Sequence, residues 1–273
     1  MIARRPGAGF TIITNQEIYP DHYLMELRRE GAGFDASPGQ FVNVLAAGGV
    51  TDPLLRVPLG IHRIRKNGIA LFYKVVGKAT GILSRKRKGD PLDILGPLGR
   101  GFYPETGEKE EKKINVLVAG GHGAAPLYAL AQREREKGKE VAVFLGASTK
   151  KHIVLSREFR QLGCRVKTAT EDGSAGRKGY VTCLLEDLLK QKNGEFAVYS
   201  CGPTPMLARL AELAAEKGIR ARVSVDTYMA CGTGVCRGCA IMTREGYKLS
   251  CTDGPVFYSD EIVWQEKLEG CGE

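Results

Sequence analysis

Four cysteines toward the C-terminal end of this 273-residue chain are separated by short, regular gaps. They follow the pattern C-x4-C-x2-C-x11-C and are Cys231, Cys236, Cys239 and Cys251. Three closely spaced thiolates and a more distant fourth thiolate are the ligand set of a plant-type 2Fe-2S cluster. Glycines separate the first three cysteines, and glycine lets a backbone curve closely around a bound group. The pattern therefore predicts a 2Fe-2S cluster, with the fourth ligand returning from a hairpin over residues 240–250, and it indicates electron transfer.

Clustered cysteines can also bind zinc or form disulfides. A zinc site usually shows two C-x2-C pairs, and a disulfide framework needs an oxidising compartment. The other four cysteines, Cys164, Cys183, Cys201 and Cys271, are scattered, which fits a reducing interior. The first residues lack the apolar segment of a secretory signal, and no run of about 18 apolar residues occurs. We therefore expect a cytoplasmic protein that binds no membrane.

Two glycine-containing loops have the chemistry of a phosphate site. Gly120, Gly121 and Gly123 follow an apolar segment at 114–119, and Cys201-Gly202-Pro203 follows another at 196–200. Each loop opens a helical pattern, where unpaired backbone N–H groups attract anions. The first loop is not a G-x-G-x-x-G fingerprint, and a plain tight turn explains it about as well. Together the loops predict a dinucleotide site at the carboxyl edge of a parallel sheet.

Three regions position these residues. Strand-like segments at 10–14, 22–27, 40–44 and 69–76, separated by Gly, Pro and Asp, predict an antiparallel β-barrel or sandwich. A glycine-rich polar stretch at 96–113 then interrupts the pattern. Further on, strands alternate with helices, which predicts a parallel α/β sheet. The expected strands are 114–119, 140–145, 165–169, 196–200 and 219–225, and the expected helices are 125–137, 156–162, 181–192 and 204–217.

The chain is thus predicted to be multidomain, β plus α/β. Its parts are a barrel over 1–108, a nucleotide-binding α/β domain over 109–224 and a small 2Fe-2S module over 225–273. We find no acid–base pair or activated nucleophile, so no catalytic residue is expected. His122 is interpreted as a loop residue, and Cys201 as a packing group rather than a nucleophile.

The formal charge of +9 does not predict a nucleic-acid partner. Its basic residues match no DNA- or RNA-binding motif and are not interleaved with aromatics. The run Arg85-Lys86-Arg87-Lys88 is read as a solvated turn or helix end, with a site for an anionic cofactor or partner as the alternative.

The order of barrel, α/β domain and cysteine module resembles the ferredoxin-NADP reductase superfamily. Within that superfamily, the chain resembles the electron-transfer subunits of NAD-dependent dihydroorotate dehydrogenase. The resemblance covers nearly the whole chain and rests on segments 38–41, 92–99, 201–207, 229–232 and 253–257. It implies FAD in the barrel, NAD at Gly120, Gly121, Gly123, Cys201, Gly202 and Pro203, and a subunit of an NAD(P)H-linked flavin iron–sulfur oxidoreductase in pyrimidine biosynthesis. The partner implied is an FMN-containing dihydroorotate dehydrogenase subunit, two copies of each forming a heterotetramer.

The flavin segments of that family match three stretches here. They are 56–60, 72–74 and 79–80, that is Arg56, Val57, Pro58, Leu59, Gly60, Phe72, Tyr73, Lys74, Ala79 and Thr80. Three positions depart from the family pattern. Val57 replaces an arginine, Gly60 replaces a serine and Ala79 replaces a glycine. These losses of a charge and a hydroxyl predict weakened or altered flavin binding, which Arg56 and Lys74 would partly offset.

Two other functions remain open at this point. The small subunit of an electron-bifurcating or sulfide-dependent ferredoxin-NAD(P) reductase is similar over its whole length. In the bifurcating enzyme's pattern an aspartate replaces the first cysteine, so Cys231 argues against it. A non-catalytic module that senses redox state through the cluster is the alternative from another class. For the partner, a docking face around Val235, Met242 or Phe257 is expected, unless these residues are core.

Overall fold

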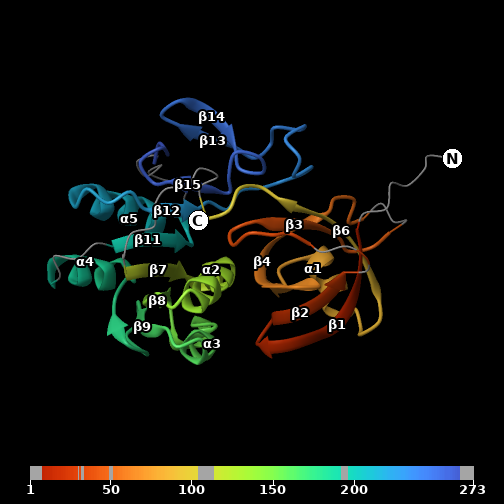
Figure 1. The fold of residues 1–273 in the computed structure, drawn as a ribbon, viewed down its shortest axis with the longest axis horizontal. Coiled ribbons are helices and arrows are strands. Elements are labelled where there is room, and N and C mark those ends of the chain that lie inside the picture. Colours follow the sequence, from red (N-terminus) through yellow and green to blue (C-terminus); the bar gives the residue numbers. More distant parts are fainter. Residues whose placement is uncertain are drawn as a thin grey trace.

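The computed structural model describes residues 8–29, 31, 34–48, 52–103, 114–191 and 196–264. The barrel lies beside the α/β sheet, and the C-terminal segment runs along one edge of both (Figure 1). The predicted boundary between residues 108 and 109 and the thiol of Cys271 lie outside the described residues. Within the described part, no helix is long and apolar enough to cross a membrane.

The N-terminal part is a closed antiparallel barrel with strand order β1-β2-β5-β4-β3-β6. Its elements are β1 (Ala8–Tyr19), β2 (His22–Arg29), β3 (Phe41–Leu45), β4 (Val57–Arg65), β5 (Gly68–Lys74), α1 (Lys78–Ser84) and β6 (Pro91–Leu98). Side chains alternate across each strand, so Val42 and Val44 of β3 fill the barrel core while their neighbours point outward. The predicted barrel is confirmed. Sequence patterning missed β4 and β6 as strands, because prolines and glycines interrupt both.

The second part is a seven-stranded sheet of order β10-β9-β8-β7-β11-β12-β15. The six strands from β10 to β12 are parallel, as predicted from the alternation of strands and helices. Helices α2 and α3 contribute to the apolar core on one face, and α4 and α5 to the core on the other. The elements are β7 (Ile114–Gly120), η1 (Gly121–Gly123), α2 (Ala124–Glu136), β8 (Val141–Ala147), η2 (Lys150–His152), α3 (Ser156–Gln161), β9 (Arg165–Thr170), β10 (Arg177–Lys178), α4 (Thr182–Gln191), β11 (Phe196–Cys201), α5 (Thr204–Glu216) and β12 (Arg222–Ser224).

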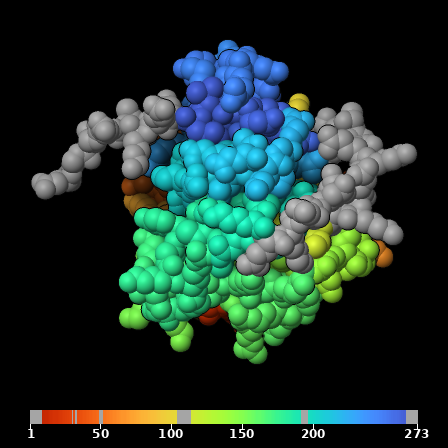
Figure 2. Space-filling model, turned by 90° about the vertical axis from the view of Figure 1, so that its left-hand side faces the viewer, coloured from red at the N-terminus to blue at the C-terminus, as the bar shows by residue number. Residues whose placement is uncertain are grey.

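The C-terminal segment is joined to the sheet. It contains the predicted hairpin, β13 (Ala240–Thr243) and β14 (Gly246–Leu249), followed by β15 (Val256–Tyr258). Strand β15 pairs antiparallel with β12 and becomes the sheet's edge strand. In the space-filling view the segment (blue) sits directly on the α/β domain (Figure 2). The expected third module therefore takes much of its core from the second, because so short a segment cannot bury enough apolar surface by itself.

Candidate functional site

The loop that holds the cysteines is shaped to stabilise sulfur anions. The backbone N–H groups of Thr233 and Cys236 each donate to Cys231 Sγ over 3.4 Å. The hydrogen bond from the Cys236 N–H, followed by that from Thr233, lowers the pKa of Cys231 to about 6. Gly232 and Gly234 adopt φ values of +70° and +84°, which favour glycine and allow the tight curve. A thiolate held by backbone amides is what a metal–sulfur ligand requires.

The other two thiols lie deeper. Cys239 and Cys251 are buried, and burial followed by the neighbouring Cys239 raises the pKa of Cys251 to about 11. In the described part of the chain, no three His, Cys, Asp or Glu side chains gather closely enough to hold a single metal ion. The Cys236 backbone N–H donates to Cys231 Sγ, and Cys239 is a neighbour of Cys251, so the four thiols lie in one loop region. Cysteine thiolates are the usual ligands of iron–sulfur clusters, and this set of thiols fits such a cluster.

The cysteine loop is seated on the outer face of β3. Phe41 packs with Cys239 and Cys251 in a small apolar cluster. Two residues later, Asn43 Nδ2 donates to the carbonyl oxygen of Cys231 over 3.0 Å. Residues two apart share one face of a strand, so Phe41 and Asn43 together hold both pairs of cysteines against the barrel.

The first of the expected flavin segments lies one strand away. In the β3–β4 pairing, Gly60 is opposite Phe41 and Pro58 is opposite Asn43. Side chains opposite each other in an antiparallel pair share a face, with Cβ atoms about 5 Å apart. The same face reaches the α/β domain, because a methyl group in place of the Gly60 hydrogen would lie 3.5 Å from Pro126 Cβ. Strand β4 therefore separates the cysteine loop from the start of α2.

Two apolar side chains near the expected flavin segments are exposed on the barrel. Leu54 and Val76 are 74% and 78% exposed. The Lys78–Asp52 ion pair ties the loop that carries Leu54 to the turn that carries Val76. Arg56 is already engaged, with its guanidinium bonded to the carboxylate and carbonyl of Asp93. Its ability to replace the arginine missing at 57 is correspondingly reduced.

The other expected flavin residues are placed differently from one another. Tyr73 points into the barrel core, and its hydroxyl donates to Asn15 Oδ1. The buried Thr80 hydroxyl accepts the N–H groups of Val76 and Gly77, so it shapes the turn before α1. Ala79 packs against the barrel core beside it. The structure thus leaves segment 56–60 half-buried and the turn at 76–78 exposed, while Tyr73 and Thr80 are buried.

Phe72, next to Tyr73, faces the opposite way, into the seam between the barrel and the α/β domain. Its ring stacks on His22 and His122 and lies 5.7 Å from the ring of His62. Burial, followed by the neighbouring His22, lowers the pKa of His122 to about 4, with a smaller lowering from the charge of the exposed Lys74. His122, in η1, therefore contributes to an aromatic seam rather than to a catalytic pair.

The two expected nucleotide loops meet. Cys201 at the end of β11 pairs with Ala119 of β7, so the residues that follow emerge side by side. A methyl group at Gly123 would lie 2.2 Å from the carbonyl oxygen of Cys201, and one at Gly120 would lie 2.6 Å from Pro203. These glycines are required for the loops to touch, whereas a methyl group at Gly121 would meet nothing within 4 Å. The two loops are therefore open to solvent on the side of Gly121.

The helices behind these loops leave their N–H groups unpaired by side chains. Neither α2, which begins at Ala124, nor α5, which begins at Thr204, has a side-chain cap. Two such helix ends at one edge of a parallel sheet favour a pyrophosphate. Burial raises the pKa of Cys201 to about 12, so this thiol is protonated and not a nucleophile. Its interpretation as a packing group stays a prediction.

Known proteins match this arrangement over almost its full length. The model of the iron-sulfur cluster binding domain of dihydroorotate dehydrogenase B matches residues 226–263, and the oxidoreductase NAD-binding domain model matches residues 117–212. The electron transfer subunit of dihydroorotate dehydrogenase B (NAD(+)) from Desulforamulus reducens is 39% identical over 91% of this chain and 95% of its own length. The chain belongs to this family. The subunit of the same name from Shouchella clausii is 38% identical over 95% of this chain and 99% of its own length. The resemblance inferred from the motifs is confirmed.

Solved structures share the architecture. A chain of the NADH-dependent reduced ferredoxin-NADP oxidoreductase, described for flavin-based electron bifurcation, matches with a TM-score of 0.78 and 30% identity, covering 97% of this chain and 92% of its own length. The ferredoxin reductase of carbazole 1,9a-dioxygenase matches with a TM-score of 0.64 and 19% identity, over 78% of this chain and 66% of its own. At that identity the second likeness shows the fold alone.

Sequence reasoning missed residues that join the parts. Asn43 carries no sequence signal, because a polar residue within an alternating strand is ordinarily a solvated one. His62 lies where the pairing of β4 with β5 shifts register, and this bulge turns its side chain toward α2. No periodicity reveals such a bulge in advance.

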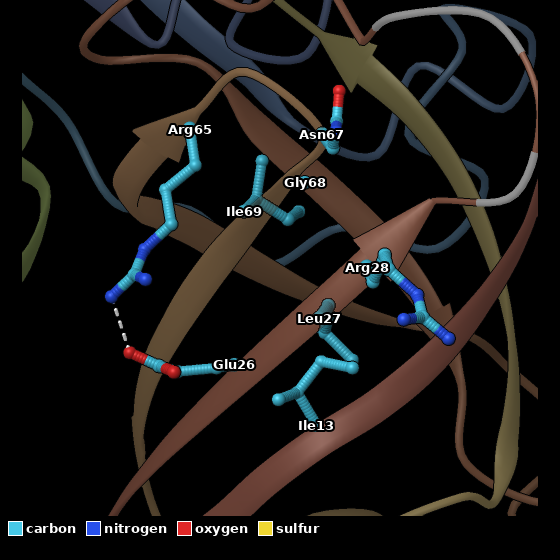
Figure 3. Close-up of a pocket in the computed structure, with 8 residues that line it drawn as sticks. All are labelled: Ile13, Glu26, Leu27, Arg28, Arg65, Asn67, Gly68 and Ile69. Atoms are coloured by element: carbon cyan, nitrogen blue, oxygen red, sulfur yellow. Dashed lines mark hydrogen bonds and ion pairs between the residues drawn. The ribbon is translucent and has the colours of Figure 1, made fainter.

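A small pocket on the barrel is separate from this site. It has a volume of about 170 Å³ and lies between β1, β2 and the β4–β5 turn (Figure 3). An ion pair between Arg65 and Glu26 spans its rim, and Arg28 points away from that pair. None of its lining residues belongs to the cysteine loop, the flavin segments or the glycine loops. We assign it no role in the site.

Proposed function

We propose that this chain carries electrons from dihydroorotate, oxidised in a partner subunit, through a 2Fe-2S cluster and a bound FAD to NAD⁺. The observation that supports this is the position of β4. Its segment 57–60 lies between β3, which seats the cysteine loop, and Pro126 of α2, which follows the nucleotide loop. A flavin at this segment would face the cluster on one side and the nicotinamide on the other.

The division of labour follows from the chemistry. Oxidation of dihydroorotate releases two electrons, an iron–sulfur cluster passes them singly, and NAD⁺ takes both with one proton as a hydride. A flavin can exchange either one or two electrons, so it supplies the conversion when bound. This chain's own residues bind the cofactors, orient them and shield them from water. Backbone amides hold Cys231 as a thiolate, β3 and β4 fix the spacing between the cofactor sites, and the open space beside Gly121 is available to the dinucleotide.

The partner that supplies the electrons is proposed to be an FMN-containing catalytic subunit, with two copies of each chain in the complex. Val235 is 83% exposed within the cysteine loop, and Tyr228 precedes that loop fully exposed. Apolar side chains this exposed beside an electron-accepting centre suit a docking face. Phe257 does not belong to it, because that ring is buried between β15 and the sheet core. For Phe257 the core alternative therefore applies. The docking face around Val235 and Met242 stays a prediction, as do the domain boundaries and the cytoplasmic location.

The deciding experiment uses the complex purified anaerobically from the native source. We expect iron and acid-labile sulfide at two each per chain, one FAD, and NAD⁺ reduction that depends on dihydroorotate. NADH added to the complex should bleach the flavin and the cluster together. Zinc in place of iron, or a complex that turns over without reducing the cluster, would contradict the proposal. Steady NADH–dye reductase activity excludes the redox-sensor alternative.

The bifurcating reductase subunit is the second candidate, favoured by the extensive likeness to the chain of the NADH-dependent ferredoxin-NADP oxidoreductase. The two functions differ in the electron donor. Dihydroorotate reducing the complex supports the first, and reduced ferredoxin or NADPH reducing it, with no response to dihydroorotate, supports the second. The intact set of four cysteines beginning at Cys231 favours the first.

A further inference from the structure

Asn43 is a buried amide on the barrel that uses only part of its hydrogen-bonding capacity within this chain. It is 1% exposed, and Nδ2 donates to the carbonyl oxygen of Cys231 over 3.0 Å. Its Oδ1 atom is buried without a partner among the described residues. An unpartnered buried oxygen costs free energy, and an apolar side chain of equal volume would avoid that cost. The barrel's stability alone therefore does not account for an amide at this position.

Gly232 is complementary to that amide. A methyl group in place of its hydrogen would lie 2.1 Å from Asn43 Nδ2, and its φ of +70° favours glycine independently. Only glycine at 232 lets the amide reach the carbonyl of Cys231. Gly234 also has a positive φ, but a methyl group there would meet Thr252 and not the barrel. The close fit is specific to the contact between Asn43 and the first cysteine.

The neighbours of Asn43 connect this contact to the rest of the site. Phe41, on the same face of β3, packs with Cys239 and Cys251, so it supports the second pair of thiols through apolar contact alone. The first pair has Asn43 as its hydrogen bond to the barrel. Across the strand pair, Asn43 is opposite Pro58 of the proposed flavin segment. One side chain thus touches the cysteine loop and borders the flavin segment.

We propose that Asn43 is a positioning residue that holds the first half of the cluster loop against β3 and thereby sets the separation between the cluster and the flavin. The inference rests on the proposed function, since it presumes that both groups bind. It assigns Asn43 no contact with substrate and no proton transfer. Its role is carried by the Nδ2 donor, which the variants below remove without changing the thiolates.

The first test compares two identical substitutions in the barrel. Asn43→Asp keeps the volume and removes the donor to Cys231. Asn15→Asp is the matched control, because Asn15 Nδ2 donates to the carbonyls of Leu83 and Lys86 on a different part of the barrel. In the reconstituted full-length complex, we expect Asn43→Asp to release iron to a chelator roughly tenfold faster, as loss of an outer-shell partner does. Asn15→Asp should release iron at the wild-type rate even if its barrel unfolds at a lower temperature.

The second test is a double-variant cycle that does not depend on Asn43→Asp folding. Gly232→Ala displaces the amide, and Asn43→Ala removes it, so the two changes break one contact, and their combined effect on iron release should be smaller than the sum of the two single effects. Gly234→Ala, also at positive φ, should add to Asn43→Ala. Flavin-to-cluster electron transfer after mixing with NADH gives the second readout, and it should slow in the Asn43 and Gly232 variants with the flavin's own reduction rate unchanged.

The outcomes distinguish a failure of the role proposed for Asn43 from a failure of the proposed function. Wild-type complex that binds no cluster or flavin would overturn both. A loaded wild type, with Asn43→Asp releasing iron and exchanging electrons at the wild-type rates, would overturn only the role of Asn43. Equal acceleration by Asn15→Asp, or additive effects of Asn43→Ala and Gly232→Ala, would reduce Asn43 to a contributor to barrel stability.

Discussion

At the scale of single residues, the glycines of the nucleotide loop separate into two kinds that substitution should distinguish. A methyl group at Gly123 would collide with the backbone carbonyl of Cys201 at 2.2 Å, whereas one at Gly121 would project into open space. Overpacking of this kind costs about 1–3 kcal/mol, and Gly121→Ala costs about 1 kcal/mol for its left-handed backbone. We expect Gly123→Ala to weaken NADH binding at least tenfold, measured by fluorescence titration, because the two loops must separate.

Gly121→Ala is the control for that prediction. It lies in the same loop and has a φ of +51°, but a methyl group there would reach neither Pro203 nor Cys201. Equal losses of NADH affinity in the two variants would show that loop contact is not what the glycines provide. Urea unfolding of both variants measures the stability costs independently of the ligand.

At the scale of elements, the contact between β4 and α2 should make folding stability depend on pH. His62 is fully buried where the β4 bulge meets α2, its Nδ1 donating to the carbonyl oxygen of Ala125. Burial, followed by the charges of Arg63 and His122, lowers the pKa of His62 to about 3. The unfolded chain takes up a proton near the ordinary histidine pKa of about 6.5 and the folded chain does not. Stability is therefore complete above pH 6.5 and falls as the pH drops toward 3.

The test of that contact is the substitution His62→Gln, which keeps a donor toward Ala125 but does not titrate. From pH 6.5 to pH 5.0 the unfolding free energy of the wild type should fall about 2 kcal/mol more than that of the variant, because each pH unit is worth about 1.4 kcal/mol. Urea unfolding at pH 7.5 and pH 5.0 measures this difference. If the unfolding free energies of the two proteins fall equally between pH 7.5 and pH 5.0, then His62 takes up a proton in the folded chain without disrupting the contact between β4 and α2.

At the scale of the whole molecule, the C-terminal segment is both a cofactor loop and part of the sheet, and two apolar residues in it separate these roles. Phe257 is 4% exposed within the core of the α/β domain, and Val235 is 83% exposed in the cysteine loop. Phe257→Ala should lower the unfolding free energy by about 3–5 kcal/mol, as for other buried phenylalanines. Val235→Ala should change it by less than about 0.5 kcal/mol.

Val235→Ala also tests the docking face. Val235→Ala is expected to weaken association with the catalytic subunit severalfold, as measured by titration calorimetry, while the iron content stays that of the wild type. Unchanged affinity for the partner would remove Val235 from the interface. A Phe257→Ala protein as stable as the wild type would show that β15 is dispensable to the sheet.

The sequence by itself predicted the chemistry of this protein and placed most of its elements. Ligand spacing is local, so the four cysteines beginning at Cys231 are recognisable without the fold, and the glycine and Cys-Gly-Pro loops are recognisable in the same way. Hydrophobic periodicity is local as well. It placed four barrel strands and nearly all of the α/β elements, and it failed at β4 and β6, where Pro58, Gly60 and Pro97 interrupt the pattern.

Only the tertiary structure decided how these parts meet. That Asn43 bonds to Cys231, 188 residues away, depends on barrel closure and on the seating of the C-terminal loop, and neither is encoded within a short window. Strand register turned Tyr73 inward, and the bulge turned His62 toward α2. Phe257 lies in the core because β15 pairs with β12 at the edge of the sheet. A residue's neighbours in space are set by long-range strand pairing. The residue type therefore indicates which chemistry is possible, and its position in the fold decides whether that chemistry is used.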